Sequence, residues 1–205
     1  PDRGFFDLVR WQLSSNPYDK RREPVIPVVA NDGRSLLGAE AGASVTWVGH
    51  ATFAVHDETD VFLTDPHFGD RALILGRQVP PGIPLESVPL HAFAVLSHNH
   101  YDHLDAGTVQ ALPAGMAWFV PLGMADWFRR RGRNDVVELD WWQSARHGRF
   151  TITCVPVQHW SMRIEQSRNS ALWCGWVIDS GERRYFFSGD TGYFHGFREI
   201  GRRLG

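Results

Sequence analysis

Short apolar runs separated by turn residues dominate the chain from Ser44 onward. The runs are rich in β-branched and aromatic residues, which is typical of β-strands. They are VTWVG, TFAV, VFLTD, FAVLSH, AWFVPL, VVEL, FTITCVPV, LWCGWVI and YFFSGD. Helical spacing is sparse between them: Asp105 can cap a helix through Leu112, and residues 122–131 and 196–204 are amphipathic. Many strands with few, late helices predict an α+β arrangement of layers rather than a doubly wound sheet.

The first 43 residues have a different pattern. Phe5, Leu8 and Val9 recur at roughly helical spacing until Asn16 and Pro17 end the run, which predicts a short amphipathic helix. A connector rich in proline and arginine follows to about Ala43, and we expect it to wrap the surface. The sequence therefore predicts a helix and connector over 1–43 and one folded domain over 44–205. A proline-rich stretch at 76–90 is either a functional flap or a surface loop.

Composition excludes several classes of protein. The 205 residues, 43% of them hydrophobic, suffice for one domain with a sizeable core. A net charge of −2 gives no overall field that would gather nucleic acid, so we expect no nucleic-acid partner. Cys154 and Cys174 lie in apolar runs and are expected to be free thiols in a reduced compartment. Without an apolar run of membrane-spanning length, we expect a cytoplasmic protein, at most peripheral to a membrane.

The segment His98-Asn99-His100-Tyr101-Asp102-His103 carries the strongest chemical signal. It follows an apolar strand directly and precedes a predicted helix cap, so its side chains can point together beyond the end of the sheet. Four of them are ordinary zinc ligands: His98, His100, Asp102 and His103. A histidine-rich surface loop is the alternative, but it would need four such residues to fall in this context by chance.

Two more residues occupy matching positions at strand ends. His159 follows FTITCVPVQ and Asp190 follows YFFSG. Taken alone, such a histidine is more often a satisfied polar residue, and an Asp in SGDTG is more often a turn former. Both gain weight because the first cluster holds too few ligands for two metal ions.

The order H-x-H-x-D-H, then a lone His, then an Asp resembles the metallo-β-lactamase superfamily. The resemblance implies a four-layer αββα sandwich with a two-zinc site at one edge of the sheets. It implies that His98, His100 and His159 hold one zinc, that Asp102 and His103 hold the second, and that Asp190 bridges both. The superfamily's second site usually takes one more histidine from a strand nearer the C-terminus. After Asp190 only His195 remains, so we expect the C-terminal part of the domain to be missing.

A narrower resemblance covers the chain from about Trp11 to Gly205. The segments WVGHATFAV, FLTDPHF, AVLSHNHYDHLD, FVPLG, ELDWW, QHW and FFSGDTGY resemble the N-acylphosphatidylethanolamine-hydrolysing phospholipase D family. This implies cleavage of a phospholipid phosphodiester to phosphatidic acid and an N-acylethanolamine. Two zinc ions would activate a metal-bridging hydroxide, and manganese or iron would accept the same ligands. Asp102 and Asp190 are the expected catalytic carboxylates, as ligands that also offer an oxygen to take a proton.

Supporting residues are assigned with alternatives open. Asp65 is expected to orient a ligand histidine or to form a turn, and His50 is a core histidine, slightly favoured, or a pocket residue. Trp141, Trp142 and Trp160 flank the motifs and would line an acyl groove, although core packing explains most tryptophans. Phe5, Phe6 and Trp11 would either insert shallowly into a bilayer or, at least as readily, pack against the domain. A homodimer is a further expectation.

Two alternatives to the phospholipase remain. The first keeps a metallo-hydrolase but changes its substrate to a lactone, sugar phosphate or nucleotide, as in families resembling ascorbate-6-phosphate lactonase. The second is an incomplete, non-catalytic metal-binding module. This alternative applies if no further chain completes the domain. An incomplete sandwich would lack a ligand for the second metal ion and would expose apolar sheet surface.

Overall fold

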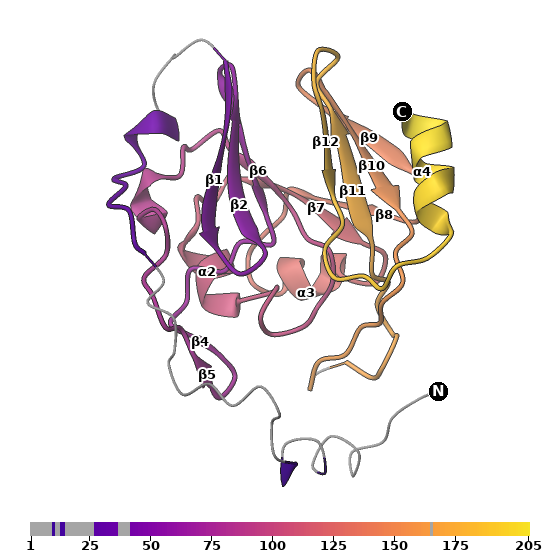
Figure 1. Ribbon diagram of the computed structural model, residues 1–205, viewed down its shortest axis with the longest axis horizontal. Helices are drawn as coiled ribbons and strands as arrows, with labels where there is room; N and C mark the ends of the chain where they lie inside the picture. The colour runs from indigo at the N-terminus through magenta and orange to yellow at the C-terminus, as the bar shows by residue number, and fades with distance from the viewer. Residues whose placement is uncertain (1–9, 11–12, 15–26, 37–41, 165) are drawn as a thin grey trace.

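The computed structural model describes residues 10, 13–14, 27–36, 42–164 and 166–205. Two β-sheets face each other, with helices on their outer sides and a small separate hairpin (Figure 1). The hairpin consists of β4 (Arg71–Ala72) and β5 (Leu75–Gly76).

The larger sheet has six strands in the order β1-β2-β3-β6-β7-β8. Its first three strands form an antiparallel meander, while β3, β6, β7 and β8 run parallel. Helix α2 (Ala106–Ala111) connects β6 to β7, and α3 (Ala125–Arg129) connects β7 to β8. The strand bounds are β1 (Ala43–Gly49), β2 (Thr52–Asp57), β3 (Asp60–Thr64), β6 (Phe93–Val95), β7 (Ala117–Pro121) and β8 (Val136–Leu139).

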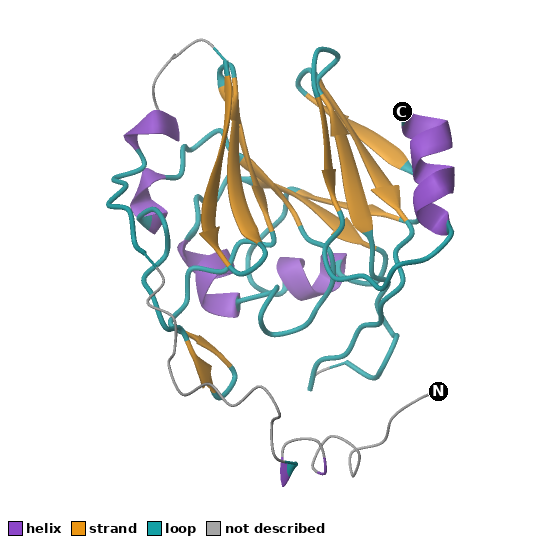
Figure 2. Cartoon of the chain, viewed as in Figure 1, coloured by secondary structure: helices purple, strands orange, loops and turns teal. Residues whose placement is uncertain are grey.

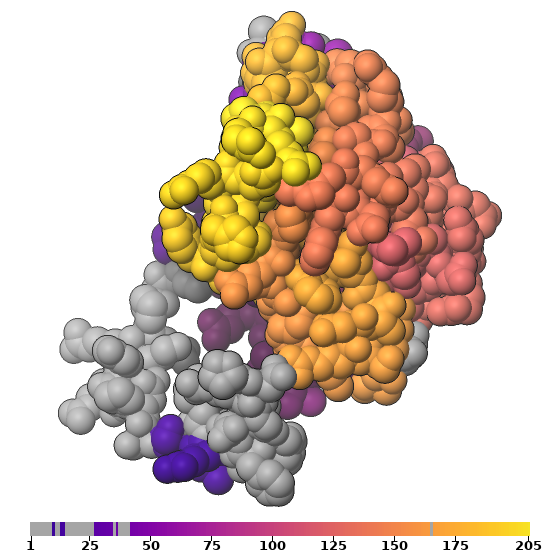
Figure 3. All heavy atoms as spheres, turned by 90° about the vertical axis from the view of Figure 1, so that its right-hand side faces the viewer, coloured from indigo at the N-terminus to yellow at the C-terminus, as the bar shows by residue number. Residues whose placement is uncertain are grey.

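The smaller sheet has four antiparallel strands in the order β12-β11-β10-β9. Helix α4 (Gly196–Leu204) follows it and lies on its outer face, as Figure 3 shows in yellow over orange. The strand bounds are β9 (Ser144–His147), β10 (Phe150–Val155), β11 (Gly175–Asp179) and β12 (Arg184–Phe187).

Three apolar clusters hold these layers together. Neighbouring residues of a strand point to opposite faces, so Phe62 packs between the two sheets while Leu63 packs toward the helix side. On that side, Trp118 of β7 and Trp127 of α3 are fully buried. A smaller cluster around Ile200 joins α4 to the four-stranded sheet. The layers therefore follow the order helix, sheet, sheet, helix (Figure 2).

The α+β class predicted from the sequence needs correction. All nine predicted strand runs contain a strand, but the larger sheet is mixed, and two of its parallel pairs are joined by helical crossovers. The fold is therefore α/β with mixed sheets. Long apolar runs such as AWFVPL look alike in parallel and antiparallel sheets, because a strand buried on both faces loses its alternation.

The three helix predictions from residue 105 onward are confirmed in place; α2 and α4 also agree in extent, whereas α3 is shorter than predicted. Asp105 caps α2 by accepting hydrogen bonds from the backbone N–H groups of Gly107 and Thr108. Helix α3 begins at Ala125 rather than Leu122, because residues 122–124 form the turn after β7. The predicted N-terminal helix, with Phe5, Phe6 and Trp11, falls almost entirely outside the described residues. In the described stretch 27–36, a 3₁₀ helix (Arg34–Leu36) places Leu36 in the core.

Three smaller expectations are also tested. The proline-rich stretch 76–90 is anchored rather than free, since Ile83 and Val88 are buried in the core and a 3₁₀ helix (Leu85–Ser87) lies between them. Cys154 and Cys174 are buried free thiols, as predicted. Among the described helices, none has the length and apolar character needed to cross a bilayer.

Candidate metal centre

Five loops bring polar side chains to one edge of the two sheets. The segment 98–103 follows β6, and Asp65 follows β3, its parallel neighbour. The turn between β1 and β2, which holds His50, lies beside the end of β3 because Phe53 pairs with Thr64. Strands β10 and β12 both run antiparallel to β11, so the segments that carry His159 and Asp190 leave the smaller sheet at one edge.

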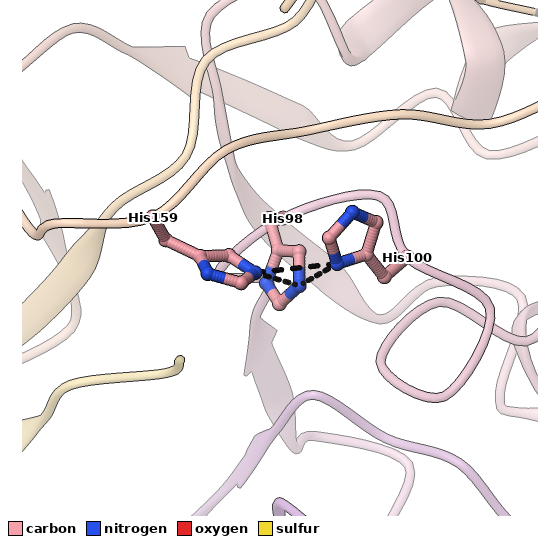
Figure 4. Close-up of side chains that lie close together, drawn as sticks. All are labelled: His98, His100 and His159. Atoms are coloured by element: carbon pink, nitrogen blue, oxygen red, sulfur yellow. Dashed lines mark hydrogen bonds between the residues drawn. The ribbon is translucent and has the colours of Figure 1, made fainter. Parts of the chain in front are cut away.

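Three imidazoles converge at this edge (Figure 4). His98 Nε2 lies 2.8 Å from His100 Nδ1, and His159 Nε2 lies 3.2 Å from each of these two atoms. In a tetrahedral zinc site, nitrogens about 2.0–2.1 Å from the ion are about 3.3 Å apart. The three nitrogens are therefore spaced as ligands of one ion would be.

A second group of possible ligands lies beside the first. His50 Nε2 is 3.1 Å from Asp102 Oδ2 and 3.3 Å from His103 Nε2. His103 Nε2 is 3.9 Å from the same Asp102 oxygen. His50, Asp102 and His103 thus form a second set with the dimensions of a metal site.

Asp190 lies between the two groups. Its Oδ1 is 3.3 Å from His103 Nε2, and its Oδ2 is 3.7 Å from His159 Nε2. Gly189 has φ +55°, and a Cβ there would overlap the side chain of Ser97. A glycine is therefore needed for the 188–190 turn to approach the 97–98 segment and carry Asp190 to its place.

Asp65 orients His103 from behind. It is fully buried, and its Oδ2 lies 2.6 Å from His103 Nδ1. The backbone N–H and hydroxyl of Ser97 donate to the two oxygens of the same carboxylate. With Nδ1–H donating to Asp65, the Nε2 lone pair of His103 faces the centre. This geometry is the one that a residue orienting a ligand histidine would have, and the role itself stays a prediction.

The electrostatics keep His98 and His100 neutral and Asp190 ionised, as metal ligands must be, while the carboxylates around His103 favour a positive charge at that position. Burial and the neighbouring imidazoles keep the pKa of His98 far below its ordinary value and lower the pKa of His100 to about 4. A hydrogen bond to His103 lowers the pKa of Asp190 to about 2. Burial would lower the pKa of His103, but hydrogen bonds to Asp190 and Asp65 outweigh it and raise the pKa to about 10. Asp65 and Asp190 stabilise a positive charge at His103, so they would equally stabilise a metal cation bound at its Nε2 in place of the proton.

The donor set fits divalent metal ions. It combines imidazole nitrogens with carboxylate oxygens. In each of two sets, His98, His100 and His159 and then His50, Asp102 and His103, the ligand atoms lie within 4.8 Å of one another. Several imidazole nitrogens face one another here, and each carries either one lone pair or one proton. A cation shared by the lone pairs satisfies all of them at once, which hydrogen bonds between the rings do not.

Comparison with known proteins agrees with the fold. A family model described as the β-lactamase superfamily domain matches residues 61–205. The chain belongs to the metallo-β-lactamase superfamily. It is 40% identical over 200 residues to N-acyl-phosphatidylethanolamine-hydrolyzing phospholipase D 1 of Caenorhabditis elegans, covering 89% of this chain and 55% of that protein.

One further relative and one solved structure of similar fold extend the comparison. The mitochondrial N-acyl-phosphatidylethanolamine-hydrolyzing phospholipase D of Saccharomyces cerevisiae is 31% identical over 168 residues, covering 76% of this chain and 36% of that protein. A possible metal-dependent hydrolase from Veillonella parvula has a similar fold, with a TM-score of 0.64 at 17% identity over 78% of this chain and 67% of its own. The chain spans about half the length of the most similar curated relatives, 55% for the Caenorhabditis protein.

The predicted substrate tryptophans separate into two kinds. The ring of Trp160 lies 4.3 Å from the ring of His100, so it borders the metal centre. Trp141 donates its indole N–H to the carbonyl of Trp173 and packs between the sheets. Trp142 packs against α4, with Arg203 over its ring. The structure supports Trp160 as a residue of the site, and it assigns Trp141 and Trp142 to packing instead.

His50 is the residue whose place the sequence predicted least well. We favoured a core histidine, but its side chain is 51% exposed and contacts Asp102 and His103, so that preference was wrong. A histidine after a strand, 48 positions before the H-x-H-x-D-H motif, gives no local sign of its destination. The strand pairing of β2 with β3, and of β3 with β6, is what brings it to the site.

Proposed function

We propose that this protein is a zinc-dependent phosphodiesterase that cleaves N-acylphosphatidylethanolamine to an N-acylethanolamine and phosphatidic acid. The position of Asp190 between two groups of imidazole and carboxylate ligands carries the hydrolase part of the proposal. The substrate is inferred from the 40% identical relative in Caenorhabditis elegans.

Each ligand residue has a distinct task in this proposal. His98, His100 and His159 would hold one ion, Asp102 and His103 would hold the second, and Asp190 would contact both. Two divalent cations at such a site supply a water of lowered pKa and neutralise charge that develops on the phosphoryl group. Zinc suits imidazole and carboxylate ligands, and manganese or iron would accept the same set.

The surroundings of the site suit a lipid. A pocket of about 420 Å³ is lined by His50 and Asp102 of the centre and also by Arg71, Ala72 and Leu75 of the β4–β5 hairpin. The tip of that hairpin exposes aliphatic side chains to solvent, with Ile74 87% exposed. An arginine near the centre suits a phosphate, and an aliphatic tip suits the surface of a bilayer. A cytoplasmic protein in peripheral contact with membranes, and a homodimer, stay predictions.

The test is a product analysis with zinc-loaded protein and N-acylphosphatidylethanolamine in mixed micelles. In ¹⁸O-labelled water, attack at phosphorus breaks the bond from phosphorus to the ethanolamine oxygen. The label should therefore appear in phosphatidic acid and be absent from the N-acylethanolamine. Asp190→Asn should lower the rate by at least about 100-fold, whereas Asp126→Asn, at an exposed position of α3, should not change it.

Other outcomes correspond to the alternatives. Turnover of a lactone, sugar phosphate or nucleotide in a parallel panel, without turnover of the phospholipid, would overturn the substrate assignment and keep the hydrolase. Tight zinc binding without turnover of any substrate would favour a non-catalytic metal-binding module.

A further inference from the structure

We propose that His50 is a ligand of the second metal ion, together with Asp102, His103 and Asp190. The inference rests on the metal-binding part of the proposed function and is independent of the substrate. It assigns an imidazole from the β1–β2 turn to a site for which the motif residues alone supply only one histidine.

The distances around His103 Nε2 carry the inference. Nitrogen and oxygen ligands about 2.0–2.2 Å from a tetrahedral zinc ion are separated by about 3.3 Å. His50 Nε2 lies 3.1 Å from Asp102 Oδ2 and 3.3 Å from His103 Nε2. Asp190 Oδ1 lies 3.3 Å from the same His103 nitrogen, and the Asp102 oxygen lies 3.9 Å from it. The atoms of His50, Asp102 and His103 are thus spaced like three corners of a coordination polyhedron, and an Asp190 oxygen lies next to the His103 corner.

Hydrogen bonding accounts for this arrangement less well. His103 Nδ1 is engaged by Asp65, which leaves Nε2 as the free atom of the ring. That one nitrogen can take part in a single strong hydrogen bond. Three polar atoms, from His50, Asp102 and Asp190, nevertheless lie within 3.3 to 3.9 Å of it. A cation among the four would satisfy all of them together.

The backbone supports a functional placement of His50. Its φ of +50° lies in the left-handed region that residues other than glycine seldom adopt. The pairing of β1 with β2 shifts register between Trp47 and Gly49, just before the turn. The indole N–H of Trp47 then donates to the carbonyl of His50 at 2.9 Å and holds that conformation. Such local strain is typical of residues fixed for a function.

The first experiment measures zinc binding. Wild-type protein and three variants, His50→Ala, His50→Gln and His91→Ala, are equilibrated in buffers of defined free zinc and analysed by mass spectrometry of the metal. His91 is the matched control, because its ring contacts the carbonyl of Thr59 beyond the opposite end of β6. Circular dichroism establishes that each variant is folded.

The expected result is a selective loss of one ion. Wild-type protein and His91→Ala should bind two zinc ions. His50→Ala and His50→Gln should keep one ion with unchanged affinity and bind the other more than about 100-fold more weakly. Loss of a residue that only orients a ligand typically lowers metal affinity by about 10- to 100-fold. A loss of affinity of about 100-fold or less would therefore assign His50 a hydrogen-bonding role instead. The glutamine keeps a hydrogen-bond donor for Asp102 and separates these two roles.

The second experiment detects the bond itself. In His50→Cys, a thiolate replaces the imidazole, and cobalt replaces zinc. Direct coordination gives a thiolate-to-cobalt charge-transfer band in the near ultraviolet that the wild type lacks. Absence of this band, with two ions still bound by every His50 variant, would overturn the inference alone. Absence of metal binding by the wild type would instead overturn the proposed function.

Discussion

The carboxylate of Asp65 lies 2.6 Å from Nδ1 of His103, and both side chains are fully buried. Asp65 follows β3 and His103 belongs to the loop after β6, so two parallel neighbours fix this contact. We expect Asp65→Asn to weaken binding of the second metal ion by about 10- to 100-fold, because the orientation and basicity of the His103 ring depend on this carboxylate. Competition with a chromophoric chelator measures the change.

The control for Asp65 is an exposed aspartate of similar chemistry. Asp126→Asn removes a charge that pairs with Arg129 on the surface of α3. It should leave both zinc affinities unchanged. Equal affinities in Asp65→Asn and the wild type would contradict the orienting role.

The β4–β5 hairpin should bind lipid surfaces. Leu73 and Ile74 are 56% and 87% exposed at its tip, while Leu75 also lines the pocket beside the centre. Burial of a leucine or isoleucine contributes about 1.5–3 kcal/mol, so partial insertion of two should matter. We expect the double variant Leu73→Ser, Ile74→Ser to bind phospholipid vesicles about 10- to 100-fold more weakly in a sedimentation assay.

Two comparisons make the hairpin result specific. Leu90 is 81% exposed but precedes β6, at the end opposite His98, so Leu90→Ser should bind vesicles normally. Hydrolysis of water-soluble bis(p-nitrophenyl) phosphate by the hairpin variant should stay at the wild-type rate. If vesicle binding survives in the double variant, the hairpin is not the lipid contact.

An ion-pair network joins the two sheets through Asp57. This carboxylate of β2 is buried and lies 2.7 Å from Arg183 and 3.2 Å from Arg149, which flank strands of the smaller sheet. Burial would raise the pKa of Asp57, but hydrogen bonds from Ser180 and Arg183 and the charge of Arg149 lower it overall. We expect Asp57→Asn to reduce the free energy of unfolding by about 1–2 kcal/mol at pH 7, since both arginines keep partial access to water.

The stability difference at Asp57 should depend on pH with a defined sign. Because the pKa is lower in the folded state, the ionised carboxylate stabilises the fold above its ordinary pKa of 3.8. This contribution is lost as the pH falls through the folded-state value. Urea unfolding from pH 7 to pH 3 should show the difference between the wild type and Asp57→Asn begin to shrink as the pH falls below 3.8. A constant difference across that range would refute the assignment.

Much of the centre could be predicted because its chemistry is concentrated in the sequence. His98, His100, Asp102 and His103 fall within six residues, and the structure brings His159 and Asp190 to the same edge. A ligand such as His50 is different, since its position depends on strand order. Nothing in VTWVGH says that its strand will end beside a motif 48 residues further on.

The limits of the fold prediction have a similar cause. Strand runs were recognisable from β-branched and aromatic residues, but β9, with the sequence SARH, has no apolar pattern and pairs through the backbone with β10. The parallel direction of β6 and β7 depends on the helical crossover between them, and α2 has only six residues. Such a short helix gives little periodic signal, so a mixed sheet was difficult to tell from an antiparallel one.

We propose that two metal ions bind side by side at this edge of the sheets. Anomalous diffraction from zinc-loaded crystals, recorded on both sides of the zinc absorption edge, tests it directly. We expect two peaks, one among His98, His100 and His159 and one beside Asp102 and His103, with Asp190 contacting both. Peaks elsewhere, or no peak within coordinating distance of these histidines, would contradict it.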